Sequence, residues 1–350
     1  MANLPLRNQV IEEDLQGIIN ANLTWADFED QTVLVSGANG FLPAYMVEAL
    51  LYLNEQRKAR HTKVIGMVRN RDNAQSRFAA YQQRDDLQLI VQDVCAPLAI
   101  DERIDYIIHA ASQASPKYFG QDPVGTLSAN VLGTHNLLNL AKDKQVKSFL
   151  FFSSGEIYGQ VDPSQIPIKE DSFGYVDPTK VRSCYAESKR MGETMCIAWA
   201  CQYNVPAKIV RPFHTYGPGM KLDDGRVFAD FVADVVNNRD IVMKSDGSAL
   251  RPFCYLADAT LGFFTVLLKG EIGQAYNIGN DKGEISILDL ANLLVTLFPE
   301  KGLKVVRQNS GFLKSPISRN CPDISKVRAL GWQPQTPVRD GFERTVRSFT

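Results

Sequence analysis

The chain has 350 residues, of which 45% are hydrophobic and 22% are charged, and its formal net charge is −1. These values are typical of a folded globular protein with one large domain or two lobes. The near-zero charge provides no basic surface for nucleic acid, and no apolar stretch approaches the ~20 residues of a membrane span. The N-terminal residues lack the pattern of a secretory signal, so we expect a cytoplasmic protein without nucleic-acid or membrane partners.

The cysteine and histidine content favours no metal site. Only four histidines are present, and no two cysteines form a C-x-x-C pair. This spacing favours free thiols over a zinc site or a disulfide framework. The six scattered cysteines are Cys95, Cys184, Cys196, Cys201, Cys254 and Cys321.

Residues 1–30 are expected to form a polar helical arm, because apolar residues recur there at helical spacing. After this arm, short apolar runs alternate with longer amphipathic segments. We expect strands at residues 32–36, 63–68, 87–92, 106–109, 148–153 and 207–210, and helices at 43–54, 124–142 and 186–203. This alternation predicts an α/β fold, a Rossmann-type doubly wound parallel sheet with helices on both faces.

The pattern changes after about residue 212, where loops rich in glycine and proline separate helices expected at 230–237 and 286–297. A late strand at 275–278 is expected to return to the sheet. We therefore predict a dinucleotide-binding domain of residues 31–212 plus about 253–280. A smaller, interleaved substrate-binding lobe would comprise residues 213–252 and 281–350.

The first predicted strand ends in a glycine-rich segment that precedes a predicted helix. Glycines permit a tight turn and let backbone N–H groups approach a pyrophosphate at the helix N-terminus. Pro43 suits the first helical turn, where no N–H is needed. The segment therefore predicts dinucleotide binding, with Gly37, Asn39, Gly40, Phe41 and Leu42 as contacts.

Two further strand ends are expected to contact the cofactor. An acid usually follows the second strand and binds the ribose hydroxyls of NAD, but this chain has Arg69 there. An arginine also suits the 2′-phosphate of NADP, so both cofactors stay open. Asp93 and Val94 follow the third strand, where a carboxylate can bind the adenine amino group.

Tyr185 and Lys189 are spaced four residues apart, on one face of a predicted helix. A phenol with a pKa of ~10 is a poor base at neutral pH, but a nearby ammonium stabilises the phenolate. Ser153 and Ser154 stand where a predicted strand ends, which is where open α/β sheets bind ligands. A Tyr–Lys pair alone is also typical of a solvated helix face, but three such motifs in order favour an enzyme.

With these motifs the chain resembles the extended short-chain dehydrogenase/reductase superfamily, in its nucleotide-sugar epimerase/dehydratase branch. Within that branch it is most similar to the UDP-glucuronate decarboxylases. The resemblance covers roughly residues 31–345. It is carried by residues 37–41, 109–116, 130, 133–134, 154–156, 182–190, 211–218, 224–227, 251–253, 276–280 and 322–324.

The resemblance implies an enzyme that uses NAD(P), with NAD as the family's usual cofactor, to oxidise the sugar carbon C4. Tyr185 would accept the O4 proton while hydride leaves C4, Ser154 would hold that oxygen, and Lys189 would tune the tyrosine and bind the cofactor ribose. Two subunits would pair through the helix that bears Tyr185 and Lys189, so a homodimer is expected. Further cofactor contacts would be Ala110, Ala111, Ser112, Asn130, Ser153, Pro212 and His214.

The implied substrate is a nucleotide-diphosphate sugar. Arg226 and Arg251 would bind the diphosphate, because a guanidinium contacts two oxygens at once. Glu156 would act as a base or orienting acid at C5. The other implied substrate contacts are Ser115, Ser154, His214 and Asn320.

The chain departs from the family pattern at several positions. Pro43 replaces a glycine, Arg69 replaces an acid, and His214 replaces an asparagine that touches phosphate. Asn320 stands where the decarboxylases have an arginine for the substrate carboxylate, with Arg319 one residue earlier. The fate of the 4-keto intermediate therefore stays open between decarboxylation and 4-epimerisation, followed by 4-keto reduction and 4,6-dehydration. A non-catalytic dinucleotide-binding sensor or scaffold is the alternative from another class.

Overall fold

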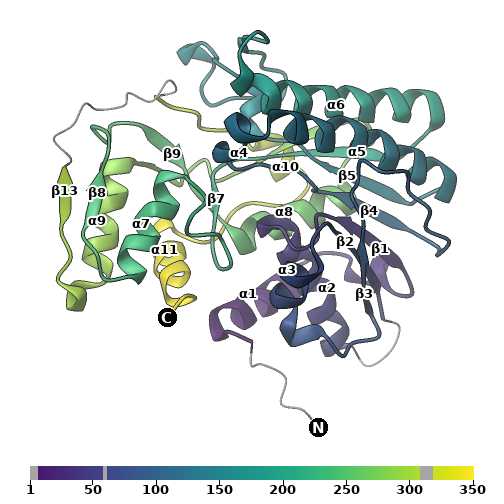
Figure 1. Cartoon of the computed structure of the whole chain (residues 1–350), viewed down its shortest axis with the longest axis horizontal. Helices are drawn as coiled ribbons and strands as arrows, with labels where there is room; N and C mark the ends of the chain where they lie inside the picture. Colours follow the sequence, from purple (N-terminus) through teal and green to yellow (C-terminus); the bar gives the residue numbers. More distant parts are fainter. Residues whose placement is uncertain (1–6, 58–60, 308–317) are drawn as a thin grey trace.

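The computed structural model describes residues 7–57, 61–307 and 318–350. At its centre is a parallel sheet of seven strands in the order β11-β6-β5-β4-β1-β2-β3 (Figure 1). Because the chain order reverses between β1 and β4, the loops after these two strands meet at the edge where ligands bind. The predicted Rossmann-type fold is confirmed. The strands are β1 (Thr32–Ser36), β2 (Lys63–Val68), β3 (Leu87–Val91), β4 (Tyr106–His109), β5 (Ser148–Phe152), β6 (Ala207–Pro212) and β11 (Ala275–Ile278).

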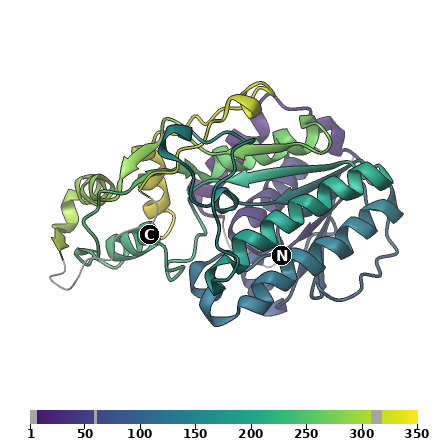
Figure 2. The ribbon, with the colours of Figure 1, turned by 90° about the horizontal axis from the view of Figure 1, so that it is seen from above.

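Alternate side chains of the strands enter separate cores on the two faces of the sheet. Val33 and Val35 of β1 pack with α1 (Gln9–Asn20), α2 (Phe41–Gln56) and α8 (Leu256–Lys269). Leu34 points to the opposite face, which α5 (Pro123–Lys144) and α6 (Cys184–Tyr203) cover. Figure 2 shows these two long helices side by side along the sheet. Strands buried on both faces explain why the predicted strands are almost wholly apolar.

The later part of the chain builds a smaller body with its own core, at the left of Figure 1. Its helices are α7 (Val227–Val236), α9 (Ile287–Leu297) and α11 (Val338–Arg347). Between α7 and α9, α8 and β11 return the chain to the main sheet. Short strand pairs complete this part: β7 (Thr215–Tyr216) with β10 (Cys254–Tyr255), β8 (Ile241–Met243) with β13 (Val305–Arg307), and β9 (Leu250–Pro252) with β12 (Glu284–Ser286).

The N-terminal segment consists of α1 and a single 3-10 turn, η1 (Trp25–Phe28), while residues 1–6 of the predicted arm lie outside the described residues. The remaining short helices include α3 (Arg71–Arg77), α4 (Pro116–Gln121), α10 (Ser325–Arg328) and the 3-10 turn η3 (Gly155–Tyr158). Within the described ranges, no helix combines the length and apolarity needed to cross a membrane.

A buried carboxylate ties α1 to both bodies of the molecule. Asp14 accepts hydrogen bonds from Tyr45 of α2, at 2.9 Å, and from Tyr255 of β10, at 2.7 Å. Arg344 of α11 forms an ion pair with the same carboxylate at 2.7 Å. Burial raises the pKa of Asp14, and these three partners act in the opposite direction. The first and last helices of the fold therefore share one polar cluster, which we call the Asp14 cluster.

Candidate active site

The glycine loop lies against the loop that follows β4. Gly37 has a φ of 68°, and a Cβ atom at this position would lie 2.8 Å from the Cα atom of Ala111. Only glycine fits this combination of backbone angle and close approach. Helix α2 begins after Gly40 without a side-chain cap, and Pro43 occupies its first turn as predicted. The first N–H groups of α2 therefore face the edge of the sheet where a pyrophosphate would bind.

A chain of hydrogen bonds holds the loop that follows β4 in place. The Thr134 hydroxyl of α5 donates to the Asn130 carbonyl at 2.6 Å, so it accepts from His109 Nε2 at 3.0 Å. The other ring nitrogen, Nδ1, then accepts from the Ser36 hydroxyl at 2.8 Å, and Ser36 Oγ accepts from the Ala111 N–H at 3.2 Å. Burial lowers the pKa of His109 to about 3, so the imidazole stays neutral. His109 therefore positions the loop as a neutral group that bonds through both ring nitrogens.

Tyr185 and Lys189 are both buried on the inner face of α6. The Lys189 ammonium donates a hydrogen bond to the Phe152 carbonyl at 2.6 Å and lies 5.9 Å from the centre of the Tyr185 ring. Burial raises the pKa of Tyr185 to about 12; the Glu156 charge adds to this rise, and a hydrogen bond with Ser154 opposes it. Burial lowers the pKa of Lys189 to about 7. The sequence-predicted Tyr, Lys and Ser are thus brought together at the end of β5.

Two residues at this site were not identified from the sequence. Phe119 of α4 stacks on the Tyr185 ring with 4.7 Å between centroids and 17° between planes. The Arg182 guanidinium lies over the Phe119 ring, 5.2 Å from its centroid, and forms a 3.0 Å ion pair with Glu156. Glu156, a predicted catalytic residue, is therefore already paired. Arg182 falls within the motif that ends in Tyr185, whereas Phe119 had no recognisable signal in the sequence.

The cofactor prediction can be tested against buried polar atoms. Within the described part of the chain, six buried side-chain atoms have no hydrogen-bond partner. Three of them belong to Gln113, Asp281 and Asn320, and the other three are Ser112 Oγ, Asn130 Oδ1 and Ser153 Oγ. Each such atom costs about 1–3 kcal/mol unless a ligand or water satisfies it. The latter three were predicted cofactor contacts, and they stand after β4, within α5 and after β5. Together with the Gly37 turn and the start of α2, they fit a bound dinucleotide.

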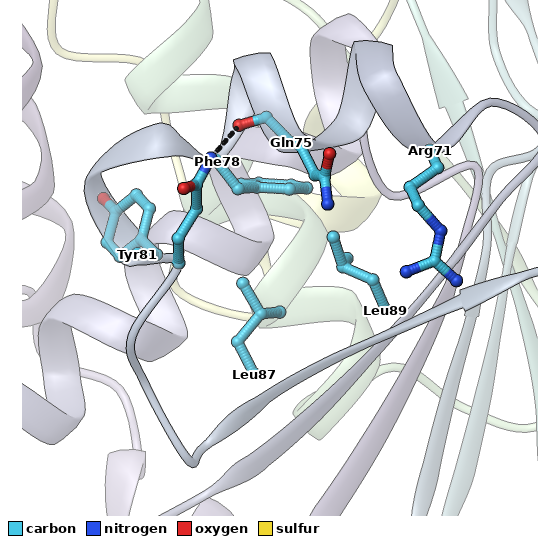
Figure 3. A pocket seen from close by; sticks show the side chains of 7 residues that line it. Arg71, Gln75, Phe78, Tyr81, Leu87 and Leu89 are labelled. Atoms are coloured by element: carbon cyan, nitrogen blue, oxygen red, sulfur yellow. Dashed lines mark hydrogen bonds between the residues drawn. The ribbon is translucent and has the colours of Figure 1, made fainter.

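The adenine side of the predicted cofactor site is less enclosed. Asp93 Oδ1 accepts a 2.8 Å bond from the Cys95 N–H, and Val94 packs against Gly133 of α5. Arg69 is exposed after β2. A hollow lies between α3 and β3, and none of the predicted site residues lines it (Figure 3). It is lined by Arg71, Gln75, Phe78, Tyr81, Gln82, Leu87 and Leu89.

Three of the predicted substrate residues, Arg226, Arg251 and Asn320, lie near His214. The Asn320 amide lies 3.0 Å from His214 Nε2. Burial lowers the pKa of His214 to about 3, and the charges of Arg251 and Arg226 lower it further. Both guanidinium groups therefore lie near the imidazole, and guanidinium groups suit phosphate oxygens.

The loops around these arginines join the two bodies. Arg226 pairs with Asp224 at 3.1 Å and donates to the Ala114 carbonyl at 3.1 Å. The Ser115 hydroxyl donates to the Asp224 carbonyl at 2.6 Å, and Arg251 donates to the carbonyl of its neighbour Leu250. Ser115 thus serves the contact between the loops in this structure.

Arg319 does not join the predicted substrate residues. It forms a 2.9 Å ion pair with Glu284 of β12, and its side chain is 43% exposed. Asn320 alone therefore occupies the position at which the decarboxylase pattern has an arginine.

Residues 33–279 match the sequence model of the NAD dependent epimerase/dehydratase family. The chain belongs to this family. UDP-glucuronic acid decarboxylase 6 of Arabidopsis thaliana is 35% identical over 319 residues, which cover 91% of this chain and 88% of that protein. UDP-glucuronic acid decarboxylase 1 of Danio rerio is 33% identical and matches 91% of this chain and 72% of its own length.

Solved structures show the same fold. A UDP-glucuronic acid 4-epimerase from Bacillus cereus, in complex with UDP-glucuronic acid and NAD, superimposes with a TM-score of 0.76 at 24% identity. The match covers 91% of this chain and 99% of that chain. Membership of the epimerase/dehydratase family confirms the resemblance predicted from the motifs and the expected cofactor, NAD. The NADP alternative, which depends on Arg69, stays a prediction.

Proposed function

We propose that this chain acts on UDP-glucuronate by NAD-dependent oxidation at C4 followed by loss of the C5 carboxylate. The observation that carries the proposal is the buried Tyr185–Lys189 pair beside Ser154. Near it, at the carboxyl edge of the sheet, buried polar atoms without partners could bind a dinucleotide. The 35% identity to a UDP-glucuronic acid decarboxylase over almost the full length of both chains supports this substrate.

The side chains divide the work of the C4 step. Bound NAD would supply the redox chemistry at C4. Ser154 would hold O4 by a hydrogen bond, and Tyr185 would accept its proton, because the nearby Lys189 ammonium stabilises the phenolate. Phe119 covers one face of the tyrosine ring and keeps water from it. Ser112, Asn130 and Ser153 would hold the cofactor through their unsatisfied oxygens.

We assign the diphosphate to the cluster around His214. Arg226 and Arg251 would each contact phosphate oxygens, and the neutral imidazole would donate a hydrogen bond to one more. Glu156 lies beside Tyr185 and would orient the sugar near C5 once its ion pair with Arg182 rearranges.

One observation favours 4-epimerisation as a second candidate. The decarboxylase pattern uses an arginine to bind the carboxylate, whereas Asn320 stands here and Arg319 is engaged by Glu284. Without that guanidinium the carboxylate is held less firmly, so the 4-keto intermediate would be reduced again on its other face before carbon dioxide is lost.

Mass spectrometry of a reaction with UDP-glucuronate and NAD tests the proposal. We expect a UDP-sugar product lighter by one carbon dioxide, formed by the wild-type chain and not by Tyr185→Phe. A product of unchanged mass that separates from the substrate on chromatography would establish 4-epimerisation instead. No product from UDP-glucuronate, nor from other UDP-, dTDP-, GDP- or CDP-sugars, would reject catalysis and favour the sensor or scaffold.

We further propose that the chain is a cytoplasmic homodimer. Exposed apolar side chains lie on the two helices that run side by side in Figure 2: Leu127 and Leu132 of α5, and Met191 and Ile197 of α6. All six cysteines are free thiols, which suits a reducing compartment. Sedimentation at micromolar concentration should give twice the mass of the chain, and a monomer there would contradict the dimer.

A further inference from the structure

His214 stands where the chain passes from β6 of the main sheet to β7 of the smaller body. The backbone around it is fixed, because the Phe213 N–H donates to the Ile278 carbonyl at 2.8 Å. The His214 carbonyl in turn accepts from the Cys254 N–H at 3.1 Å. The imidazole meets the Phe253 ring edge-on, with 6.0 Å between centroids. The side chain is half-buried, so it has a defined place and part of it stays accessible to a ligand.

Asn320 approaches this imidazole from a segment that is held on both sides. Two residues earlier, the Ser318 carbonyl accepts from the Leu250 N–H at 2.9 Å. One residue later, the Cys321 carbonyl accepts from the Ile168 N–H at 2.8 Å. Because the backbone is fixed before and after Asn320, its side-chain amide is held against the imidazole.

The contact between the two side chains determines where the imidazole carries its proton. Nδ2 of Asn320 lies 3.0 Å from Nε2 of His214. An amide nitrogen can only donate, so Nε2 accepts and carries no proton. Burial and the charges of Arg251 and Arg226 lower the pKa of the ring, so it stays neutral. A neutral imidazole has a single N–H, which in this contact belongs to Nδ1.

The oxygen of the same amide points to a ligand. Oδ1 of Asn320 is buried and has no hydrogen-bond partner within the described ranges. A buried acceptor of this kind is costly until a donor reaches it. The hydroxyl groups of a nucleotide sugar are donors, whereas its ionised phosphate oxygens only accept. The pair therefore offers an acceptor for a hydroxyl at Asn320 and a donor for a phosphate oxygen at His214.

We propose that Asn320 is a positioning residue that fixes the Nδ1–H tautomer of His214, through which the ring donates to the substrate diphosphate. With Nε2 bonded to Asn320, Nδ1 is the nitrogen that meets the ligand. The opposite tautomer would turn a lone pair toward the phosphate oxygens and repel them. The inference rests on the proposed function only in placing the diphosphate beside His214.

NMR of the NAD-bound protein with ¹⁵N-labelled histidines measures the tautomer without substrate. The chain has four histidines, and loss of one signal in His214→Asn identifies the ring. We expect a protonated Nδ1 and an unprotonated Nε2. Asn320→Asp keeps the shape of the side chain and replaces its donor by an acceptor, so Nε2 should gain a proton. A protonated Nε2 in the wild type, or an unprotonated Nε2 in Asn320→Asp, would overturn the inference.

Asn320→Ala covers the case in which Asn320→Asp does not fold. It removes the donor without adding a charge, so both tautomers should appear. Calorimetry with UDP, which supplies the diphosphate alone, should then give an affinity about three- to tenfold weaker than that of the wild type. Asn292→Ala is the matched control, because Asn292 is exposed on α9 and should leave both the ring signals and the UDP affinity unchanged.

The two measurements separate this inference from the proposed function. A single tautomer and an unchanged UDP affinity in Asn320→Ala would overturn the inference, whatever the enzyme converts. A wild-type protein that shows the Nδ1–H tautomer but binds no UDP would confirm the role of Asn320 and refute the nucleotide site of the proposed function.

Discussion

Tyr185 shows how strongly one buried position can alter an ordinary side chain. Phe119 stacks on one face of its ring and Lys189 lies 5.9 Å from the ring centre. Burial holds the phenol neutral and brings the pKa of the neighbouring amine to about 7. The two groups therefore titrate in opposite directions away from their usual values, as acid–base pairs in enzyme sites do.

At the residue scale, we expect Tyr185→Phe to lower kcat by about 10²- to 10⁴-fold, because the variant keeps the ring and loses the base. The affinity for NAD, measured by calorimetry, should stay nearly unchanged, since the cofactor is held mainly by other groups. Tyr175→Phe is the control, because Tyr175 is 67% exposed and should tolerate the same change. Turnover of Tyr185→Phe within tenfold of the wild type would remove Tyr185 from the role of base.

The sequence predicted the residues of this site that occupy recognisable local positions. Tyr185 and Lys189 are one helical turn apart, and Ser154 follows a strand, so local patterns sufficed to find them. Phe119 was not identified, because its contact with Tyr185 comes from another element, α4. The same limit applies to Arg319, whose ion pair with Glu284 of β12 had no local signal.

At the scale of elements, α6 approaches β5 unusually closely at Gly192. A Cβ atom there would collide with the Phe151 ring. This approach lets the Lys189 ammonium reach the Phe152 carbonyl. The position of α6 against the sheet thus depends on a glycine, which has no side chain.

We expect Gly192→Ala to destabilise the protein by about 1–3 kcal/mol, because the added methyl group overpacks the interface between α6 and β5. Urea unfolding measures this, and kcat/KM should fall as Lys189 is displaced. Gly17→Ala in α1 is the control, since nothing lies within 4 Å of the added atom. It should stabilise the helix by about 0.5–1 kcal/mol. Equal stability of Gly192→Ala and the wild type would contradict this account of the helix position.

The elements themselves were predictable where they are long or buried on both faces. The strands of the central sheet agree with their predicted ranges to within two residues. Helix α2 begins at Phe41 and not at Pro43, because its cap is the backbone of Gly40 and no capping side chain marks the start. The strands of two or three residues in the smaller body are too short to show any period, so the sequence could not predict them.

At the scale of the whole molecule, the Asp14 cluster joins parts that are far apart in the chain. The boundaries of the two lobes stay a prediction. The contacts of Arg344 show which helices meet where the two bodies join. Arg344 also donates to Glu13 and to the Val10 carbonyl, so α11 lies against α1 along more than one turn.

We expect Asp14→Ala to cost about 2–3 kcal/mol, because the hydroxyls of Tyr45 and Tyr255 lose their buried acceptor and Arg344 loses its ion pair. Chemical denaturation measures the loss. Glu13→Ala removes a half-exposed partner of the same arginine and should cost less than about 1 kcal/mol. Similar losses of unfolding free energy in both variants would mean that the buried contacts of Asp14 stabilise the protein no more than the exposed ion pair of Glu13.

The Asp14 cluster also constrains how the chain folds. Asp14 and Arg344 are separated by 330 residues in sequence, and Asp14 and Tyr255 by 241. Contacts between such distant residues close large loops and form late. During synthesis, α1 precedes α11 and cannot complete its polar contacts until α11 has left the ribosome. The buried Asp14 carboxylate therefore stays incompletely paired on a nascent chain until its final helix arrives.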